Sequence, residues 1–180
     1  MSIERNSYVD KSGFVEVKMI STIMEKMIAY SDGNMHDIDH LIRVWTYAKT
    51  IGELEGLDKE TQFILEVAAI THDIACPLCR EKYGNTNGKH QEVEGEILVR
   101  DFLKDSGMTE EQIDRVAFLV GHHHTFTGID GEDWQMLVEA DYIANASENS
   151  YSEQNLRNFL DKIVKTEAGR RLISEVFCLD

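Results

Sequence analysis

The chain has 180 residues, 42% hydrophobic and 28% charged, a composition typical of a globular domain with a substantial core. Its 33 acidic residues outnumber its 18 Lys and Arg residues, for a formal net charge of −15, so extended nucleic acid is disfavoured as a partner while small phosphorylated molecules are not. We find no apolar run long enough to span a bilayer and no signal-peptide pattern at the N-terminus, so we expect a cytoplasmic protein with no membrane partner. The three cysteines are too few for a disulfide framework, and we expect them to be reduced thiols.

Apolar residues recur at helical spacing along most of the chain, and no strand-like alternation competes with them. Asp58 is a candidate N-cap, and Thr109 with Gln112 forms a capping-box pattern. The pattern predicts eight helices, over about 15–30, 37–54, 59–73, 91–104, 110–124, 133–146, 153–164 and 167–177. We therefore expect an all-α fold, a compact helical bundle that forms one domain over residues 1–180.

The segment between the third and fourth predicted helices, about Cys76 to His90, contains the only proline and several Gly and Asn residues. We expect a long irregular loop here, and loops of that length in compact domains are usually functional or mobile. Arg80, Lys82 and Lys89 make it locally basic, which is consistent with a lid over a substrate site.

Four polar residues fall within or at the end of apolar helices, where an unpaired polar group would be costly: His40, His72, Asp73 and Asp141. Taken alone, His72 could be an ordinary core histidine and Asp73 a capping residue. Taken together, two neutral imidazoles and two carboxylates match the charge of one divalent cation. They come from three separate helices, so only the assembled fold would create the site.

These residues lie in segments that resemble the HD-domain superfamily of metal-dependent phosphohydrolases. DIDHLIRV (residues 37–44) resembles the family's opening D-x-x-H-x-x-R-V, AAITHDI (68–74) its His-Asp helix, and VEADYI (138–143) its closing aspartate segment. The resemblance covers about residues 35–147, with 148–180 expected to add C-terminal helices that pack on this part. It implies a compact HD-type helical domain in which His40, His72, Asp73 and Asp141 hold a metal.

Hydrolysis of a phosphate ester or anhydride by a metal-activated water follows from that ligand set. The substrate would be a small phosphorylated molecule, a nucleotide being one candidate. Mixed nitrogen and oxygen ligands suit Mn, Fe, Co, Ni or Zn, with one ion expected and two conceivable. Asp73 is the candidate catalytic residue, because its second oxygen could orient the water. Arg43, three positions after His40 on the same helix face, is a candidate substrate contact.

A second ion would need more ligands, and some HD-domain members add two histidines from the following helices. The candidates are His90 and the triplet His122, His123 and His124. His90 stands one residue further from Gly95 than the family pattern leads us to expect, so it could equally be an exposed loop residue. Within the triplet we favour His123, which lies one helical turn beyond apolar Val120; His122 and His124 could instead support the ligands or contact substrate.

Cys76 marks a departure, because family members that cleave nucleotides often carry a carboxylate at this position. Glu81 could substitute for it. Cys76 and Cys79 form a C-x-x-C, which could bind zinc or exchange thiols, but no second such pair and no βαβ context accompanies it. Two functional alternatives remain: a di-iron HD-type oxygenase, and a binding or regulatory module that keeps its metal without turnover.

Overall fold

The computed structural model describes residues 11–179, with side-chain environments from residue 15 onward. Within that range the chain is helical and contains no strand, so the all-α prediction is confirmed. The helices are α1 (Lys11–Tyr30), α2 (Met35–Glu55), α3 (Lys59–Thr71), α4 (Cys76–Tyr83), α5 (Gly88–Leu103), α6 (Glu110–Val120), α7 (Glu132–Glu148), α8 (Glu153–Lys162) and α9 (Glu167–Val176). The single-domain boundary at 1–180 stays a prediction, and its first ten residues lie outside the described range.

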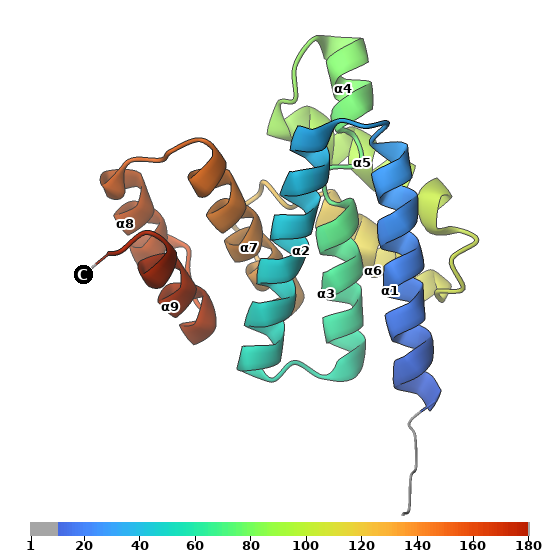
Figure 1. Cartoon of the computed structure of the whole chain (residues 1–180), viewed down its shortest axis with the longest axis horizontal. Coiled ribbons are helices and arrows are strands. Elements are labelled where there is room, and N and C mark those ends of the chain that lie inside the picture. The colour runs from blue at the N-terminus through green and yellow to red at the C-terminus, as the bar shows by residue number, and fades with distance from the viewer. Residues whose placement is uncertain (1–10, 180) are drawn as a thin grey trace, which may run out of the picture.

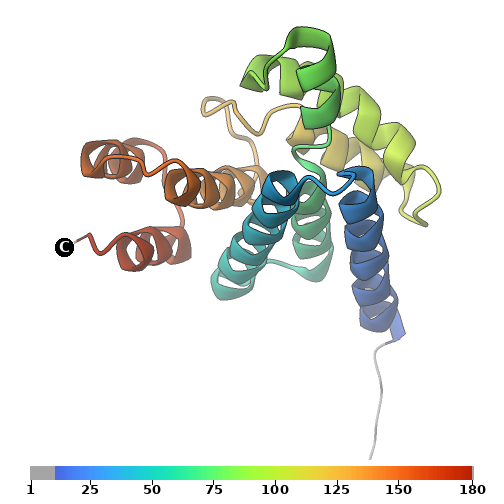
Figure 2. The same cartoon turned by 45° about the horizontal axis from the view of Figure 1, so that its top comes forward.

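Helices α2, α3 and α7 form the centre of the molecule (Figure 1). α2 packs most extensively on α7 and α3. α6 also packs on α3, and α5 packs on α6. α1 lies along α3, and α8 and α9 form the outer end beyond α7 (Figures 1 and 2). α9 contacts both α2 and α7, so the C-terminal helices pack on the central ones.

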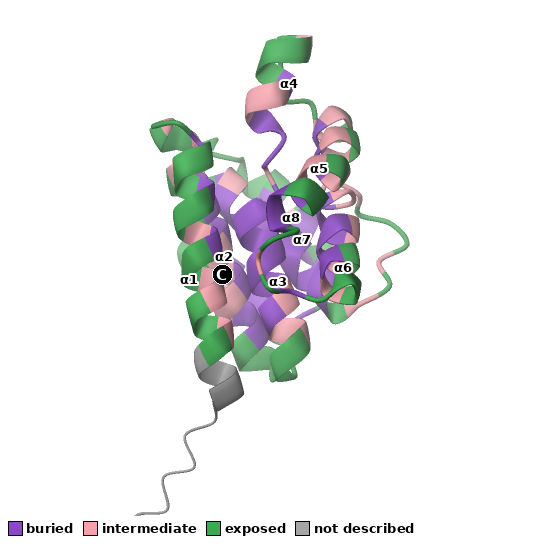
Figure 3. Ribbon diagram, turned by 90° about the vertical axis from the view of Figure 1, so that its right-hand side faces the viewer, coloured by how far each residue is buried: buried purple, intermediate pink, exposed green. Residues whose placement is uncertain are grey.

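The core runs along α3 and α7, which are buried on nearly every side (Figure 3). Leu65 and Ile70 of α3 and Leu137 and Ile143 of α7 are completely buried. Each such side chain contributes about 1.5–3 kcal/mol through removal of apolar surface from water. Polar groups on these two helices are therefore held by the best-packed part of the molecule.

Helix ends follow the predicted capping signals. Asp58 caps α3 by accepting hydrogen bonds from the backbone N–H groups of Glu60 and Thr61, and Thr109 forms a reciprocal capping box with Gln112 at the start of α6. α3 ends at Thr71, two residues earlier than predicted. His72 and Asp73 therefore lie in the turn that follows the helix.

The predicted long loop at residues 76–90 is wrong. Residues 76–83 form α4, and only a short link separates this helix from α5. Pro77 lies in the first turn, where its missing N–H costs no hydrogen bond, and Gly84 ends the helix with a φ of +70° that favours glycine. The two residues that suggested a loop are the start and stop signals of a helix.

One stretch, Lys59–Tyr83, is long and apolar enough to cross a membrane by length and composition alone. Our expectation that the chain contains no such run is therefore wrong. Of its most apolar window, 78% is buried inside the fold. This burial is the pattern of a core helix in a globular domain.

Candidate metal centre

The structure brings the four predicted ligands together from three elements. His40 comes from α2, His72 and Asp73 from the turn after α3, and Asp141 from α7. The turn is fixed by two backbone hydrogen bonds, from Ile74 N–H to the Thr71 carbonyl (3.0 Å) and from Cys76 N–H to the Asp73 carbonyl (2.9 Å). The packing of α2 on α3 and α7 therefore sets the position of every member.

Their polar atoms converge on one point. His40 Nε2 lies 3.1 Å from His72 Nε2 and 3.2 Å from Asp141 Oδ1. His72 Nε2 lies 3.5 Å from the same Asp141 oxygen. Asp73 Oδ2 is 3.6 Å from His40 Nε2 and 3.7 Å from His72 Nε2. Each imidazole nitrogen thus lies within 3.7 Å of one oxygen from each carboxylate, a spacing compatible with a shared cation.

The hydrogen bonds that His40 and His72 make through Nδ1 determine that Nε2 of each ring faces this cluster. His72 Nδ1 donates to the Ala69 carbonyl at 2.8 Å, and His40 Nδ1 donates to Glu148 Oε2 at 3.0 Å. A neutral imidazole that donates through Nδ1 presents an unprotonated Nε2. Two such lone pairs only 3.1 Å apart repel each other unless a cation or a proton lies between them. The cluster therefore fits a metal ion, and its nitrogen and oxygen donors suit Mn, Fe, Co, Ni or Zn better than Mg.

Asp73 also faces a second group of histidines. Its other oxygen, Oδ1, is 3.5 Å from Nε2 of His123, a completely buried ring whose Nδ1 donates to the Val120 carbonyl at 2.7 Å. Asp73, His123 and His124 each place a potential ligand atom within 4.8 Å of the others. The Nε2 atoms of both histidines are buried without a hydrogen-bond partner in the described part of the chain. This second group could hold another ion, with Asp73 shared between the two.

The remaining histidine candidates, His122 and His90, have other neighbours. His122 donates to the Phe118 carbonyl at 2.7 Å and stacks on the Phe118 ring. His90 stacks on Tyr83 with ring centroids 4.0 Å apart, and its Nδ1 is buried without a partner. Among the described residues, neither is grouped with the predicted ligands.

The residues of the cluster shift one another's pKa values. Burial alone would lower the pKa of His40, but its hydrogen bond to Asp141 and the charges of Asp73, Asp141 and Glu148 raise that pKa to about 10. Burial would raise the pKa of Asp141, yet the hydrogen bonds from His40 and His72 hold it well below the usual range. Without a cation, protons on histidine thus offset the ionised carboxylates.

Arg43, the predicted substrate contact, lies at the rim of the cluster. Its side chain is 48% exposed, and Nη1 is 3.9 Å from Glu148 Oε1. A shallow cavity of about 380 Å³ adjoins it, lined by His36, Asp39 and Glu148 among others. The role of Arg43 toward substrate stays a prediction.

The predicted lid residues lie on α4 and at the start of α5. Arg80 forms an ion pair with Asp37 in the first turn of α2, and Lys82 pairs with Glu94 of α5. Glu81, suggested as a substitute carboxylate, is exposed, and Lys89 is also exposed.

Both cysteines of the C-x-x-C are free and buried. Burial, together with the nearby charge of Asp73, strongly raises the pKa of the Cys76 thiol. A raised pKa disfavours the thiolate that redox exchange requires, so the structure favours two structural cysteines.

Glu148 was missed in the sequence, although a signal for it was present. It follows Asp141 by seven residues in α7, two helical turns later, and therefore lies on the same helix face. Its hydrogen bond orients His40, the carboxylate–histidine arrangement that commonly supports a metal ligand.

Comparisons with known proteins place this geometry in context. The family model described as HD domain matches residues 37–173. The crystal structure of a predicted HD superfamily hydrolase from an uncultured Thermotogales bacterium is similar to the chain, with 23% sequence identity and a TM-score of 0.63. The match covers 88% of this chain and 84% of that one, and at this identity it shows the fold alone. No curated protein matches the chain.

Proposed function

Because the chain belongs to the HD-domain family, we propose that it is a metal-dependent phosphohydrolase, which cleaves a phosphate ester or anhydride of a small phosphorylated molecule such as a nucleotide. The observation that carries the proposal is the convergence of His40 Nε2, His72 Nε2 and the carboxylates of Asp73 and Asp141. A divalent cation held by these residues would polarise a phosphoryl oxygen and lower the pKa of a water molecule to near neutrality.

Exposure indicates the side from which substrate approaches. The side chains of His40, His72 and Asp141 are at most 7% exposed, whereas that of Asp73 is 24% exposed. We therefore infer that substrate and water reach the cluster over Asp73, whose carboxylate would orient the attacking water. This position supports Asp73 as the catalytic residue.

The surrounding residues would bind and hold the substrate. Arg43 stands at the rim with a half-exposed guanidinium, which can form a bidentate contact with a phosphate group. Glu148 holds the Nδ1 proton of His40 and so keeps Nε2 directed inward. The formal charge of −15 supports a small substrate over a nucleic acid strand, since a long polyanion would be repelled by the surface.

A second candidate function is oxidation of a substrate by paired iron. The placement of His123 and His124 on the other side of Asp73 favours it, because these residues could hold a second ion. His90, which this candidate was expected to need, stacks on Tyr83 instead.

Metal analysis combined with a phosphatase assay separates these functions. The protein is purified without chelators, its metal content is measured by mass spectrometry, and phosphate release is followed from p-nitrophenyl phosphate and a panel of nucleotides with Mn, Fe, Co, Ni or Zn. We expect metal-dependent phosphate release. Two irons per chain without phosphate release would favour the oxygenase, and bound metal without release across the panel would favour a regulatory module.

The ligand assignment has its own test. His72→Ala and Asp73→Ala should each abolish metal retention while helicity, measured by circular dichroism, stays near that of the parent. Asp105→Ala, which removes an exposed carboxylate after α5, serves as the matched control and should keep its metal. Full metal occupancy in either ligand variant would show that the assignment is wrong.

A further inference from the structure

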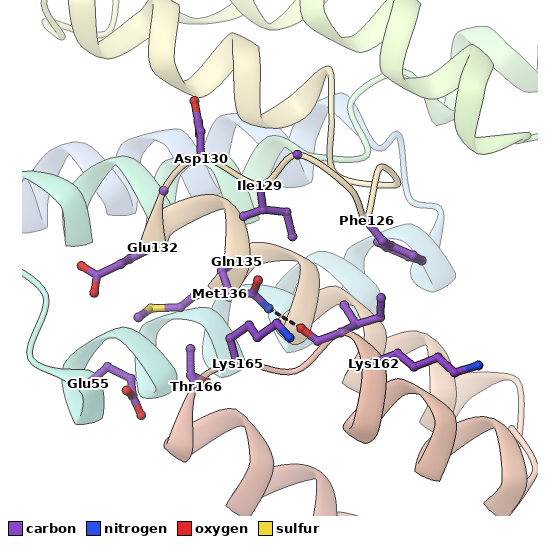
Figure 4. Close-up of a pocket in the computed structure, with 13 residues that line it drawn as sticks. Glu55, Phe126, Ile129, Asp130, Glu132, Gln135, Met136, Lys162, Lys165 and Thr166 are labelled. Carbon is purple, nitrogen blue, oxygen red and sulfur yellow. Dashed lines mark hydrogen bonds between the residues drawn. The ribbon is translucent and has the colours of Figure 1, made fainter.

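A cavity of about 620 Å³ lies apart from the metal cluster, between the first turns of α7, the loop before it and the link between α8 and α9 (Figure 4). None of the residues that line it is a predicted metal ligand. Its volume falls within the range of small-molecule sites in proteins, which is about 300–1,000 Å³.

One wall of the cavity is apolar and ends in an aromatic ring. Ile129, Met136 and Ile163 line the cavity, and Phe126 stands at one side of it with 42% of its surface exposed (Figure 4). Phe126 and Phe159 pack edge to face, with ring centroids 6.0 Å apart, so Phe159 supports the Phe126 ring. An exposed and supported aromatic face favours a planar ring as its partner.

Lys162 and Lys165 both line the cavity, but in Figure 4 the Lys162 side chain extends outward past the other labelled residues, so Lys165 forms the cationic side. Neither lysine forms an ion pair with another described residue, although acidic residues outnumber basic ones in the chain. Two of the three carboxylates in the lining are already engaged: Asp130 pairs with Arg115 at 3.0 Å, and Glu55 accepts a hydrogen bond from Ala168 N–H at 2.6 Å. The third belongs to Glu132, which lies across the cavity from Lys162 in Figure 4. The lysine side is therefore suited to an anionic group.

The segment that carries Lys165 is fixed by a buried carboxylate. Glu139 is completely buried, and its Oε1 accepts hydrogen bonds from the N–H groups of Lys165 (2.8 Å) and Thr166 (3.2 Å). Gln135 Nε2 donates both to this oxygen at 2.7 Å and to the Ile163 carbonyl at 2.9 Å. Because these contacts hold the wall in place, a ligand would meet a preformed site and lose less free energy in ordering it.

We propose that this cavity binds a small organic anion, whose planar aromatic or heteroaromatic ring packs on Phe126 and whose anionic group pairs with Lys165. The site uses neither the metal ligands nor the residues at the rim of the metal cluster. It therefore goes beyond the proposed hydrolysis and can be tested without turnover.

The test uses 1-anilinonaphthalene-8-sulfonate, an aromatic sulfonate that phosphohydrolase activity leaves intact. The full chain is titrated and fluorescence is measured, with one saturable site expected. Lys165→Gln should weaken binding about fivefold or more, because a charge-assisted contact is lost. Phe126→Ala should weaken it about fivefold or more through loss of the ring contact. N-phenyl-1-naphthylamine, which has the same rings without the sulfonate, should bind at least about fivefold more weakly than the sulfonate.

Lys18→Gln is the control, since it removes an exposed charge from α1, on the far side of α3. It should leave the affinity for the sulfonate unchanged. Circular dichroism establishes that each variant is folded, and Lys165 is exposed, so its replacement should not disturb the core. Unchanged affinity in Lys165→Gln, an equal loss in the Lys18 variant, or equal binding of the uncharged ring would each overturn the proposal.

Discussion

Glu148 controls which nitrogen of His40 faces the metal cluster, because its Oε2 accepts the Nδ1 proton at 3.0 Å. Without this acceptor the imidazole can rotate or place its proton on Nε2, which removes a ligand. We predict that Glu148→Ala weakens metal binding about 10–100-fold, the usual cost of losing such a supporting carboxylate. Glu148→Gln, which keeps an oxygen acceptor, should lie between this variant and the parent.

The measurement is a competition titration of the metal against a chelator of known affinity. Glu153→Ala, an exposed carboxylate at the start of α8, is the matched control and should behave as the parent. An unchanged affinity in Glu148→Ala would show that the packing of α2 alone orients His40.

His40 makes metal binding depend on pH. In the metal-free protein the charges of the neighbouring carboxylates raise the pKa of His40 to about 10, from an ordinary value of 6.5. Because its pKa is raised in the folded state, the protonated His40 stabilises the metal-free fold. This contribution is complete below pH 6.5 and is lost as pH rises through 10. A cation must displace that proton, so its affinity should rise about tenfold per pH unit between these two values.

Calorimetric titrations in buffers with different ionisation enthalpies measure this proton directly. We expect about one proton to be released for each cation bound near pH 7.5. Binding without proton release at that pH would show that His40 is already neutral in the metal-free protein.

At the scale of residues, the sequence predicted the members of the main cluster because each polar residue lies within or at the end of an apolar segment that resembles an HD-domain motif. It also favoured His123 within the triplet, and the structure directs that ring toward Asp73 while His122 packs on Phe118. Their roles as ligands stay predictions. The contact between Glu148 and His40 could not be derived from helical patterns alone, because it depends on how α7 packs against α2.

At the scale of elements, an ion pair links α4 to the first turn of α2. Among the helices it packs mainly on α5, and Arg80 reaches across to Asp37 in the first turn of α2. Arg80 Nη1 donates to Asp37 Oδ1 at 3.2 Å, with the arginine side chain 41% exposed. A partly exposed pair of this kind contributes about 0–1 kcal/mol, so it can break without unfolding the core.

We predict that Arg80→Gln increases amide hydrogen exchange in α4 by up to about fivefold, since about 1 kcal/mol of closure is lost. Exchange in α3, which is buried, should be unchanged. Arg100→Gln removes a comparable surface pair with Asp114 and should leave α4 unaffected. If α4 exchanges at the parent rate in Arg80→Gln, the ion pair does not hold the helix in place.

The wrong prediction of a loop at α4 shows that the presence of proline and glycine is not enough to predict a loop, because their positions along the segment also matter. Proline and glycine were interpreted as breakers, yet proline is favoured in the first helical turn and glycine just after the last one. The other helices were predicted correctly because long apolar patterns identify amphipathic helices more clearly than a helix of eight residues can.

At the scale of the whole molecule, Glu139 connects α7 to the link between α8 and α9. Its carboxylate accepts hydrogen bonds from the backbone of Lys165 and Thr166, the Thr166 hydroxyl and Gln135, all in a buried position. We predict that Glu139→Ala lowers the free energy of unfolding by about 3–5 kcal/mol, because several buried donors lose their acceptor. Glu139→Gln should cost less, about 1–3 kcal/mol.

Urea denaturation followed by circular dichroism gives these values. Glu175→Ala, an exposed carboxylate in α9, should change the free energy of unfolding by no more than about 0.5 kcal/mol. A loss below about 1 kcal/mol in Glu139→Ala would mean that water replaces the carboxylate at little cost.

The all-α class could be predicted from the sequence, since helical periodicity is local information. The relative placement of the helices could not, because it depends on side-chain packing between segments distant in the sequence. The resemblance to the HD-domain family supplied that placement for the main cluster. It supplied nothing for the cavity beside α7, whose walls come from residues 126–136 and from the C-terminal link at 162–166.

Helix α7 serves both sites. It contributes Asp141 and Glu148 to the metal cluster and its surroundings, and Gln135 and Met136 to the cavity near its first turns. Two ligands that contact one rigid element are subject to thermodynamic reciprocity. If a bound cation changes the affinity of the cavity for its anion by some factor, the bound anion must change the affinity of the metal cluster for the cation by the same factor. The concentration of one small molecule could thus set how readily the protein acquires its metal.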